Sequence, residues 1–420
     1  MKTSILWPHA RRQACALALF LALPVAAASP PGADLDSVHS WLRQHNSALL
    51  ARTLDAEAAA ERIGPAGALP DPMFELELDG IDFDRPRALP AQVETTVYRV
   101  RQQFPLWGKR ALAREVATHE AAAAGFRREA TLLELVEQAD MAWLTWWHAQ
   151  ASATAIDRVL GVMAQMRELA RTRYAAGLAP QQDAIRADVE LTSMRRMQIE
   201  LVAQGARARS TLNARLGRNP QDVLTTPAGE PEIALDLPLD ELLADAAERH
   251  PMTQAEASMR AARLGMAEEV RRERLPDIGV GLGLMQMGDR AEGWELMFEV
   301  EIPLQQGARR QRERAADLRA EAAGAREQAI VDELRGRVGA AYAMWQSAGE
   351  QESLVSGQLL PQAQAGLESA LAGYQVGAVD FDTLLQALTL TLNAERDRLD
   401  ARRDRLLAAV ELKLLQGKLP

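Results

Sequence analysis

The chain has 420 residues, of which 48% are hydrophobic and 25% are charged, and its formal net charge is −10. This composition excludes a disordered chain, and the acidic balance disfavours a protein that binds the phosphate backbone of nucleic acids. Alanine, leucine, glutamate and arginine are abundant, which is typical of long helices.

Residues 1–28 have the pattern of a secretory signal peptide. Basic residues precede an apolar run at 14–25, and the small residues at 26–28 offer a cleavage site. The single cysteine, Cys15, lies in this segment, so we expect the mature chain to form no disulfide and no thiolate metal site. No later segment has about 18 consecutive apolar residues, so a membrane location would require β-strands.

The first half of the mature chain, residues 29–217, is predicted to contain a helix and then two strands, 72–80 and 92–104. Apolar and acidic residues alternate along 73–79, which predicts a strand with one apolar side and one side in contact with water. The alternation in 92–104 is less regular, and a phase break near Val97 and Tyr98 predicts a β-bulge there.

A long helical hairpin, residues 107–217, is predicted to follow these strands. Residues 107–173 contain no proline, so a single helix over this stretch would be about 100 Å long. Apolar residues from Leu132 to Trp146 have the spacing of a coiled-coil seam. We interpret the cluster of Trp143, Trp146, Trp147 and His148 as a packed helix interface. Residues 218–238 contain four prolines and are predicted to form an irregular linker.

The second half, residues 239–420, has the same order of features. It is predicted to contain a helix, strands at 277–288 and 294–303, and a hairpin at 306–417 that contains one proline, Pro361. Tyr-x-x-Gly occurs at Tyr174 and again at Tyr374, and a glycine follows each hairpin at the same offset. These pairs in the same order predict an internal two-fold repeat.

The alternating strands leave two architectures open. In a soluble sheet the apolar face covers a core, whereas in an outer-membrane barrel it faces lipid and the acidic face lines a lumen. Four strands are too few to close a barrel, so several chains would have to combine their strands. The predicted export and the long helices favour the membrane architecture.

The sequence contains no motif for catalysis, and we expect no enzyme activity, no cofactor and no resident metal site. Phosphate loops, zinc-protease motifs and nucleophile elbows are absent, and the histidines are scattered. Met285 and Met287 offer thioethers suited to Cu(I), but we favour flexible filling at the end of a strand.

The chain resembles the TolC-type outer membrane factors over nearly all of its mature length. The resemblance depends on the duplicated Tyr-x-x-Gly turns, on Pro-Leu junctions at 105–110 and 303–310, and on Leu-Pro-Asp at 69–71 and 275–277. It implies a mainly α protein with β, located in the outer membrane with a periplasmic helical domain. It further implies a homotrimer, in which each chain adds four strands to a twelve-stranded β-barrel and its helices to a long antiparallel α-barrel.

The resemblance also implies roles for the hairpin ends. The residues expected to contact a periplasmic adaptor are Tyr174, Gly177, Tyr374, Val376, Gly377 and Ala378. The candidate gate residues are Arg173, Asp183, Asp380 and Asp382. In a trimer, inward carboxylates would form acidic rings, for which the candidates are Glu75, Glu77, Asp79, Glu295, Glu299 and Glu301. We favour ordinary solvation of the lumen over tuned selectivity as their role.

The function expected from this resemblance is passive conduction of a substrate that an inner-membrane pump of the resistance-nodulation-division class delivers through the adaptor. The Phe104–Trp107 junction is closest in style to the heavy-metal branch, CusC- or CzcC-like, with copper, silver, cobalt, zinc and cadmium left open. The alternatives are the same duct serving drugs or type I protein secretion, a periplasmic coiled-coil adaptor, and a secreted enzyme.

Overall fold

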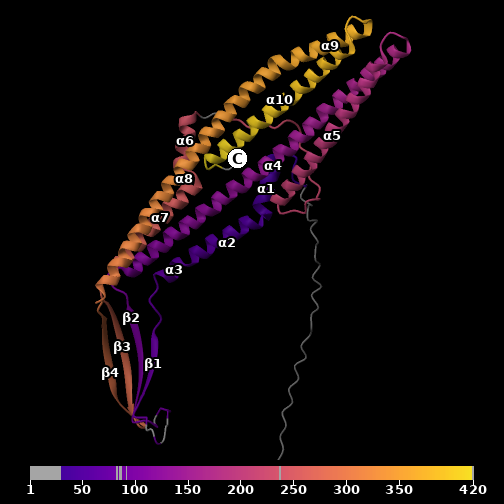
Figure 1. Ribbon diagram of the computed structural model, residues 1–420. Helices are drawn as coiled ribbons and strands as arrows, with labels where there is room; N and C mark the ends of the chain where they lie inside the picture. Colours follow the sequence, from indigo (N-terminus) through magenta and orange to yellow (C-terminus); the bar gives the residue numbers. More distant parts are fainter. Residues whose placement is uncertain (1–29, 82–83, 85–87, 91, 236–237, 419–420) are drawn as a thin grey trace, which may run out of the picture.

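The computed structural model describes residues 30–81, 84, 88–90, 92–235 and 238–418. The predicted signal peptide and Cys15 lie outside these residues. The described chain is elongated, with a four-stranded sheet at one end and the bends of two helical hairpins at the other (Figure 1). Within the described part, no helix has both the length and the apolar character needed to cross a membrane.

The first half runs from short helices through two strands into a long hairpin (Figure 1). Its elements are α1 (Leu35–His45), α2 (Ser47–Glu61), α3 (Ile63–Ala66), β1 (Met73–Asp79), β2 (Thr95–Phe104), α4 (Lys109–Ala175) and α5 (Gln181–Arg215). The proline-free stretch forms one helix of 67 residues, as the sequence predicts. Residues 216–235 contain no helix or strand.

The second half has the same order of elements. They are α6 (Leu239–Glu248), α7 (Pro251–Arg272), β3 (Asp277–Met287), β4 (Arg290–Glu301), α8 (Gln306–Leu354), a π-helix η1 (Val355–Leu359), α9 (Leu360–Val376) and α10 (Phe381–Leu415). β4 begins at Arg290, four residues before the expected start. The π-helix lies directly before Pro361, whose ring and missing N–H are incompatible with an uninterrupted α-helix.

The four strands form one antiparallel sheet in the order β1-β2-β3-β4, which confirms the predicted four-strand arrangement. The ladders of β2 with β1 and β3 are continuous, and the one register shift lies between Met285 and Gln286 in the pairing of β3 with β4. The predicted bulge near Val97 is therefore wrong. Val97 keeps the alternation on the charged face, where it is opposite Glu77 and Met285, and its neighbours cover it to 8% exposure.

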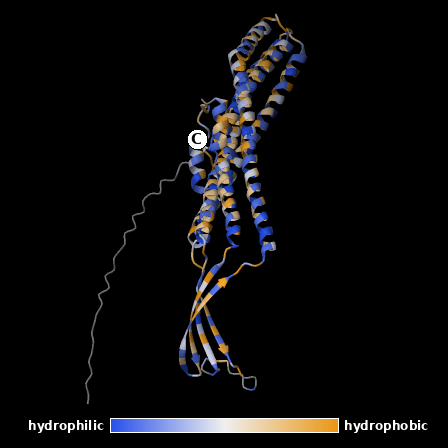
Figure 2. Cartoon of the chain, turned by 90° about the vertical axis from the view of Figure 1, so that its left-hand side faces the viewer, coloured by the Kyte–Doolittle hydropathy of each residue, from blue (hydrophilic) through white to orange (hydrophobic). Residues whose placement is uncertain are grey.

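The hydrophobic core lies between the helices and has three parts. One part joins α1, α4, α5 and α10 around Trp143, Trp146 and Trp147, which confirms the interpretation of this cluster as a packed interface. A second part fills the ends of both hairpins, and a third joins α6, α8 and α10. The strands instead carry both hydrophobic and hydrophilic positions along their length (Figure 2).

Candidate functional site

The two hairpin ends have the same backbone turn. Gly177 follows the end of α4 and Gly377 follows the end of α9, with φ of 73° and 79°. After each glycine an N–H closes the turn: Leu178 donates to the Arg173 carbonyl and Ala378 donates to the Gly373 carbonyl, both at 2.8 Å. Both turns need a left-handed residue, which glycine supplies without a steric penalty. Val376, beside the second turn, is 80% exposed.

Arg173 joins the end of the first hairpin to the end of the second. Its Nη1 donates to the carbonyl oxygens of Tyr374 at 2.7 Å and of Gln375 at 2.9 Å. These carbonyls belong to the last turn of α9, where helix carbonyls lack the usual N–H four residues on, and the Tyr374 carbonyl also accepts from the Gly377 N–H at 3.2 Å. The guanidinium also lies 4.9 Å from the centre of the Tyr374 ring, within cation–π distance.

Tyr374 makes the second link between the hairpins. Its hydroxyl donates to Oδ2 of Asp183 on α5 at 3.1 Å, and its side chain is buried. Burial, followed by the interaction with Asp183, raises the pKa of Tyr374 to about 12. Tyr174, at the matching position of the first hairpin, is 46% exposed, so the duplicated motif has two different environments.

The remaining acidic candidates at this end differ in their contacts. Asp382 forms an ion pair with Arg186 of α5, which is a third link between the hairpins. Asp380 instead caps its own helix, because its Oδ1 accepts from the Thr383 N–H at 2.8 Å. Hydrogen bonding with Thr383, first through its side chain and then through its backbone N–H, lowers the pKa of Asp380. Sequence reasoning missed Arg186; its place one turn after Asp183 was the available signal.

The sheet has one apolar and one charged face. Aligned positions on the apolar face include Leu76, Tyr98, Leu284 and Trp294, and those on the charged face include Glu75, Arg99, Gly283 and Glu295. All six acids predicted for a lumen lie on the charged face. Four of them contact arginines that the sequence analysis did not consider. Arg99 lies 3.3 Å from Glu75, 3.6 Å from Glu77 and 3.0 Å from Glu295, and Arg101 lies 3.0 Å from Glu299.

The last two lumen candidates have other surroundings. Asp79 accepts from the Gly80 N–H at 2.8 Å, and Glu301 is in register with Asp277 at the helical end of the sheet. Asp277 accepts from Lys109 Nζ at 2.8 Å and from the Leu106 N–H at 3.0 Å. The Leu-Pro-Asp motif of one half is thus fixed to the Gly-Lys-Arg junction of the other, where the strands pass into helices.

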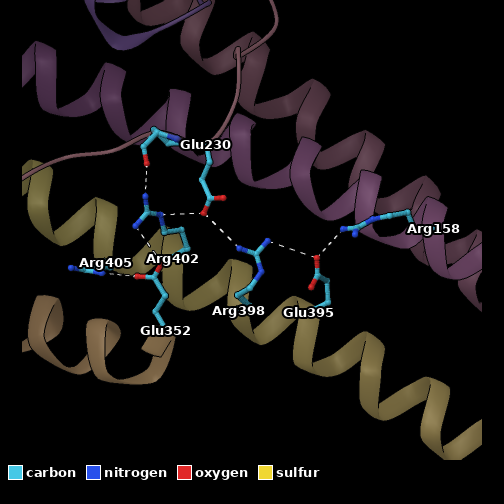
Figure 3. Close-up of polar contacts among 8 residues, drawn as sticks. Arg158, Glu230, Glu352, Glu395, Arg398, Arg402 and Arg405 are labelled. Atoms are coloured by element: carbon cyan, nitrogen blue, oxygen red, sulfur yellow. Dashed lines mark hydrogen bonds and ion pairs between the residues drawn. The ribbon is translucent and has the colours of Figure 1, made fainter. Parts of the chain in front are cut away.

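An ion-pair cluster fixes the irregular linker to the helices (Figure 3). Glu230 of the linker lies 3.3 Å from Arg402 and 3.6 Å from Arg398, both on α10. Arg402 also donates to the Pro231 carbonyl at 2.7 Å and lies 3.3 Å from Glu352, near the end of α8. Arg405 lies 2.9 Å from the other oxygen of Glu352. The linker and the last turn of α8 before the π-helix are therefore held by the same arginine.

A buried pair joins α1 to α4. His39 Nε2 and Asp140 Oδ1 are 2.6 Å apart, and each residue is 2% exposed. Burial raises the pKa of Asp140, and the hydrogen bond and charge of His39 oppose that rise. One turn further along α4, Trp143 Nε1 donates to the Gly32 carbonyl at 2.7 Å. His39, Asp140 and Trp143 line a cavity of about 400 Å³ that α10 and the linker complete.

Comparison with known proteins finds several that are similar to this chain. Residues 242–418 match the family described as outer membrane efflux protein. Comparison with curated proteins finds no match. The chain has a TM-score of 0.79 with the outer-membrane channel OprN, at 20% identity, covering 91% of this chain and 89% of that one.

Two further solved structures have the same fold. CusC, described as forming a transmembrane channel, has a TM-score of 0.78 at 17% identity, with 91% of this chain and 92% of CusC covered. The open state of the MtrE outer membrane channel of Neisseria gonorrhoeae has a TM-score of 0.76 at 18% identity, with 93% and 89% covered. Together with the family match, these structures confirm the resemblance to TolC-type outer membrane factors. The expected outer-membrane location agrees with all these descriptions.

Proposed function

From the match of its second half to the outer membrane efflux proteins, we propose that this chain is one subunit of an outer-membrane exit duct. The observation that carries this proposal is the two-faced sheet. Phe74, Trp294 and Phe298 on the apolar face are 66%, 76% and 72% exposed, and no element of the described chain covers them. Lipid would cover this face, and the charged face would then line an aqueous lumen.

A trimer explains both the open sheet and the exposed helices. Four strands are too few for a barrel, but three chains supply twelve. The helix α5 also exposes Ile185, Val189, Ile199 and Val202, which adjacent subunits of an α-barrel would cover. We extend the proposal to the internal two-fold repeat, because both halves have the same order of helix, strand pair and hairpin.

A pair of substitutions on adjacent residues of β4 tests the duct. We expect Phe298→Lys to cost about 2 kcal/mol per chain, because a lysine would face hydrocarbon, and to reduce the membrane-assembled trimer. Met297→Lys is the matched control, since the adjacent side chain lies on the charged face and should be tolerated. The measurement is membrane fractionation followed by gel mobility with and without heating. Equal trimer yield from the two variants would contradict the orientation of the sheet.

The proposed substrate is a heavy-metal cation delivered passively from a resistance-nodulation-division pump through an adaptor seated on the hairpin ends. Support comes from the charged face of the sheet, which combines carboxylates with four methionines: Met73, Met285, Met287 and Met297. Thioethers suit soft cations such as Cu(I). The alternative is the same duct serving drugs or type I protein secretion. Growth of a deletion strain on copper, silver, zinc, cobalt and cadmium, beside a drug panel, separates the two: sensitivity to drugs alone would reject the metal substrate.

We also propose that the contacts between the hairpin ends hold the duct closed. Asp382→Asn removes the ion pair with Arg186 that joins α5 to α10. Because exposed pairs contribute about 0–1 kcal/mol, we expect the open fraction in planar bilayers to rise roughly two- to fivefold. Asp188→Asn is the control, since its pair with Arg171 lies within one hairpin. An equal rise in both variants would count against a gate at the Arg186 contact.

A further inference from the structure

The middle of the charged face of β3 carries no side chains. Gly279, Gly281 and Gly283 occupy three successive positions on this face. Their backbone is ordinary extended strand, because none of them is among the residues with positive φ. The glycines are therefore not required for backbone conformation. Side chains of β2 and β4 lie over them, since added Cβ atoms would meet Glu299 at Gly279, Met297 and Arg99 at Gly281, and Glu295 at Gly283.

Two arginines of β2 reach across β3 to β4. Adjacent strands are about 4.8 Å apart, so β2 and β4 are separated by roughly 10 Å. Arg99 Nη2 nevertheless lies 3.0 Å from Glu295 Oε1, and Arg101 Nη1 lies 3.0 Å from Glu299 Oε2, both on β4. The Arg99 side chain is only 12% exposed, although its Glu295 partner is 39% exposed. The guanidinium therefore lies flat along the wall rather than extending into the lumen.

Side chains on β3 would obstruct this crossing. A Cβ at Gly281 would lie 3.5 Å from Arg99 Cδ and 3.1 Å from Met297 Cε, and one at Gly279 would lie 3.2 Å from Glu299 Oε2. A methyl group would thus be in tight contact with Met297 or Glu299 and, at Gly281, in ordinary contact with Arg99. A larger side chain at Gly281 would occupy the path of this arginine. The glycines of β3 thus leave the space that the arginine side chains of β2 need to reach β4.

We infer that Arg99 and Arg101 determine the charge selectivity of the duct, an inference that rests on the proposed function. Each guanidinium offsets carboxylates that would otherwise attract cations, and it holds them against the wall. In a trimer the two positions give six guanidiniums around the lumen, interleaved with the acidic rings. The acids still outnumber the arginines on this face, so the wall prefers cations, but less strongly than its carboxylates alone dictate.

The test is the reversal potential of the full-length trimer in planar bilayers of phosphatidylcholine under a KCl gradient. We expect R99Q/R101Q to raise the potassium-to-chloride permeability ratio about threefold at 0.1 M salt, because six cationic groups are lost and screening limits their effect. R99K/R101K should keep a ratio near that of the wild type, since the charge remains. An unchanged ratio in a conducting R99Q/R101Q duct would overturn the inference.

A second variant keeps the test decisive if R99Q/R101Q does not assemble. E295Q/E299Q leaves both arginines in place and removes their partners on β4, so the permeability ratio should fall below that of the wild type. A ratio equal to or above the wild-type value would overturn the inference. R196Q, an exposed substitution on α5, controls for charge changes outside the sheet. A wild-type trimer that does not conduct would reject the proposed function itself, whereas a conducting trimer with unaltered selectivity in the variants would reject only the role of the arginines.

Discussion

Replacing Asp140 by alanine should lower the free energy of unfolding by about 3 kcal/mol, because it removes one member of a buried, hydrogen-bonded pair. Asp140 and His39 are each 2% exposed, so the substitution leaves His39 Nε2 buried without its carboxylate partner. The pair lies beside the tryptophan cluster and attaches α1 to the longest helix. The measurement is the urea dependence of helical circular dichroism, at equal protein concentration for each variant.

Two variants define the cause of this loss. Asp140→Asn retains an oxygen that can accept from His39, and we expect it to cost about 1 kcal/mol. Asp157→Ala, an exposed change on the same helix, should have little effect. A loss from Asp157→Ala as large as that from Asp140→Ala would show that the effect arises from the helix and not from the buried pair.

The stability of the protein should fall as pH decreases from 6.5 to 4, in part because of His250. His250 precedes α7, and its Nδ1 accepts from the Met252 N–H at 3.2 Å. Burial, followed by the charge of Arg337, lowers the pKa of His250 to about 4 from the ordinary 6.5. His250 therefore binds a proton near pH 6.5 in the unfolded chain, but only near pH 4 in the folded chain. Neutral His250 makes its full contribution to stability above pH 6.5, and up to about 3 kcal/mol of the free energy of unfolding is lost near pH 4.

The comparison of His250→Asn with the wild type isolates this effect. Asparagine is a good N-cap that does not titrate, so the variant should lose less stability than the wild type between pH 6.5 and 4. His119→Asn provides the control for removing a histidine elsewhere. The cavity beside His250, of about 170 Å³, is also lined by Glu134, Glu137, Glu333 and Arg337, and these groups are unaltered in both variants. The same pH profile in His250→Asn and the wild type would contradict the assignment.

Much of the fold could be predicted because local patterns determine it. The absence of proline from 109–175 and the alternation along β1 and β4 are properties of single segments, and the structure has a helix and strands there. The error at Val97 arose because one apolar residue on the charged face looks like a change of phase. Neighbouring strands cover Val97. Its burial therefore depends on strand pairing, which the residues of its own strand do not reveal.

The contacts of the candidate site were harder to predict because they join distant residues. Arg99 and Glu295 are brought together only by the strand order and by the glycines between them, although Arg99, Arg101 and the alternate glycines are visible in the sequence. Tyr174 and Tyr374 have the same local motif, yet one is exposed and the other buried. Arg173 packs on Tyr374 alone, and a repeated motif cannot indicate such a difference.

The π-helix before Pro361 has a consequence for the lengths of the two hairpins. Corresponding residues are 198 positions apart at Leu106 and Leu304, 199 apart at Gly108 and Gly307, and 200 apart at the hairpin turns. The second half is therefore two residues longer than the first on the way from sheet to turn. A π-turn contains one residue more than the α-turn it replaces. Residues 355–359 thus accommodate one of the two additional residues as a local bulge. The side chains beyond the bulge keep the angular positions that they would have in an α-helix one residue shorter. Hairpins of unequal length can therefore end together.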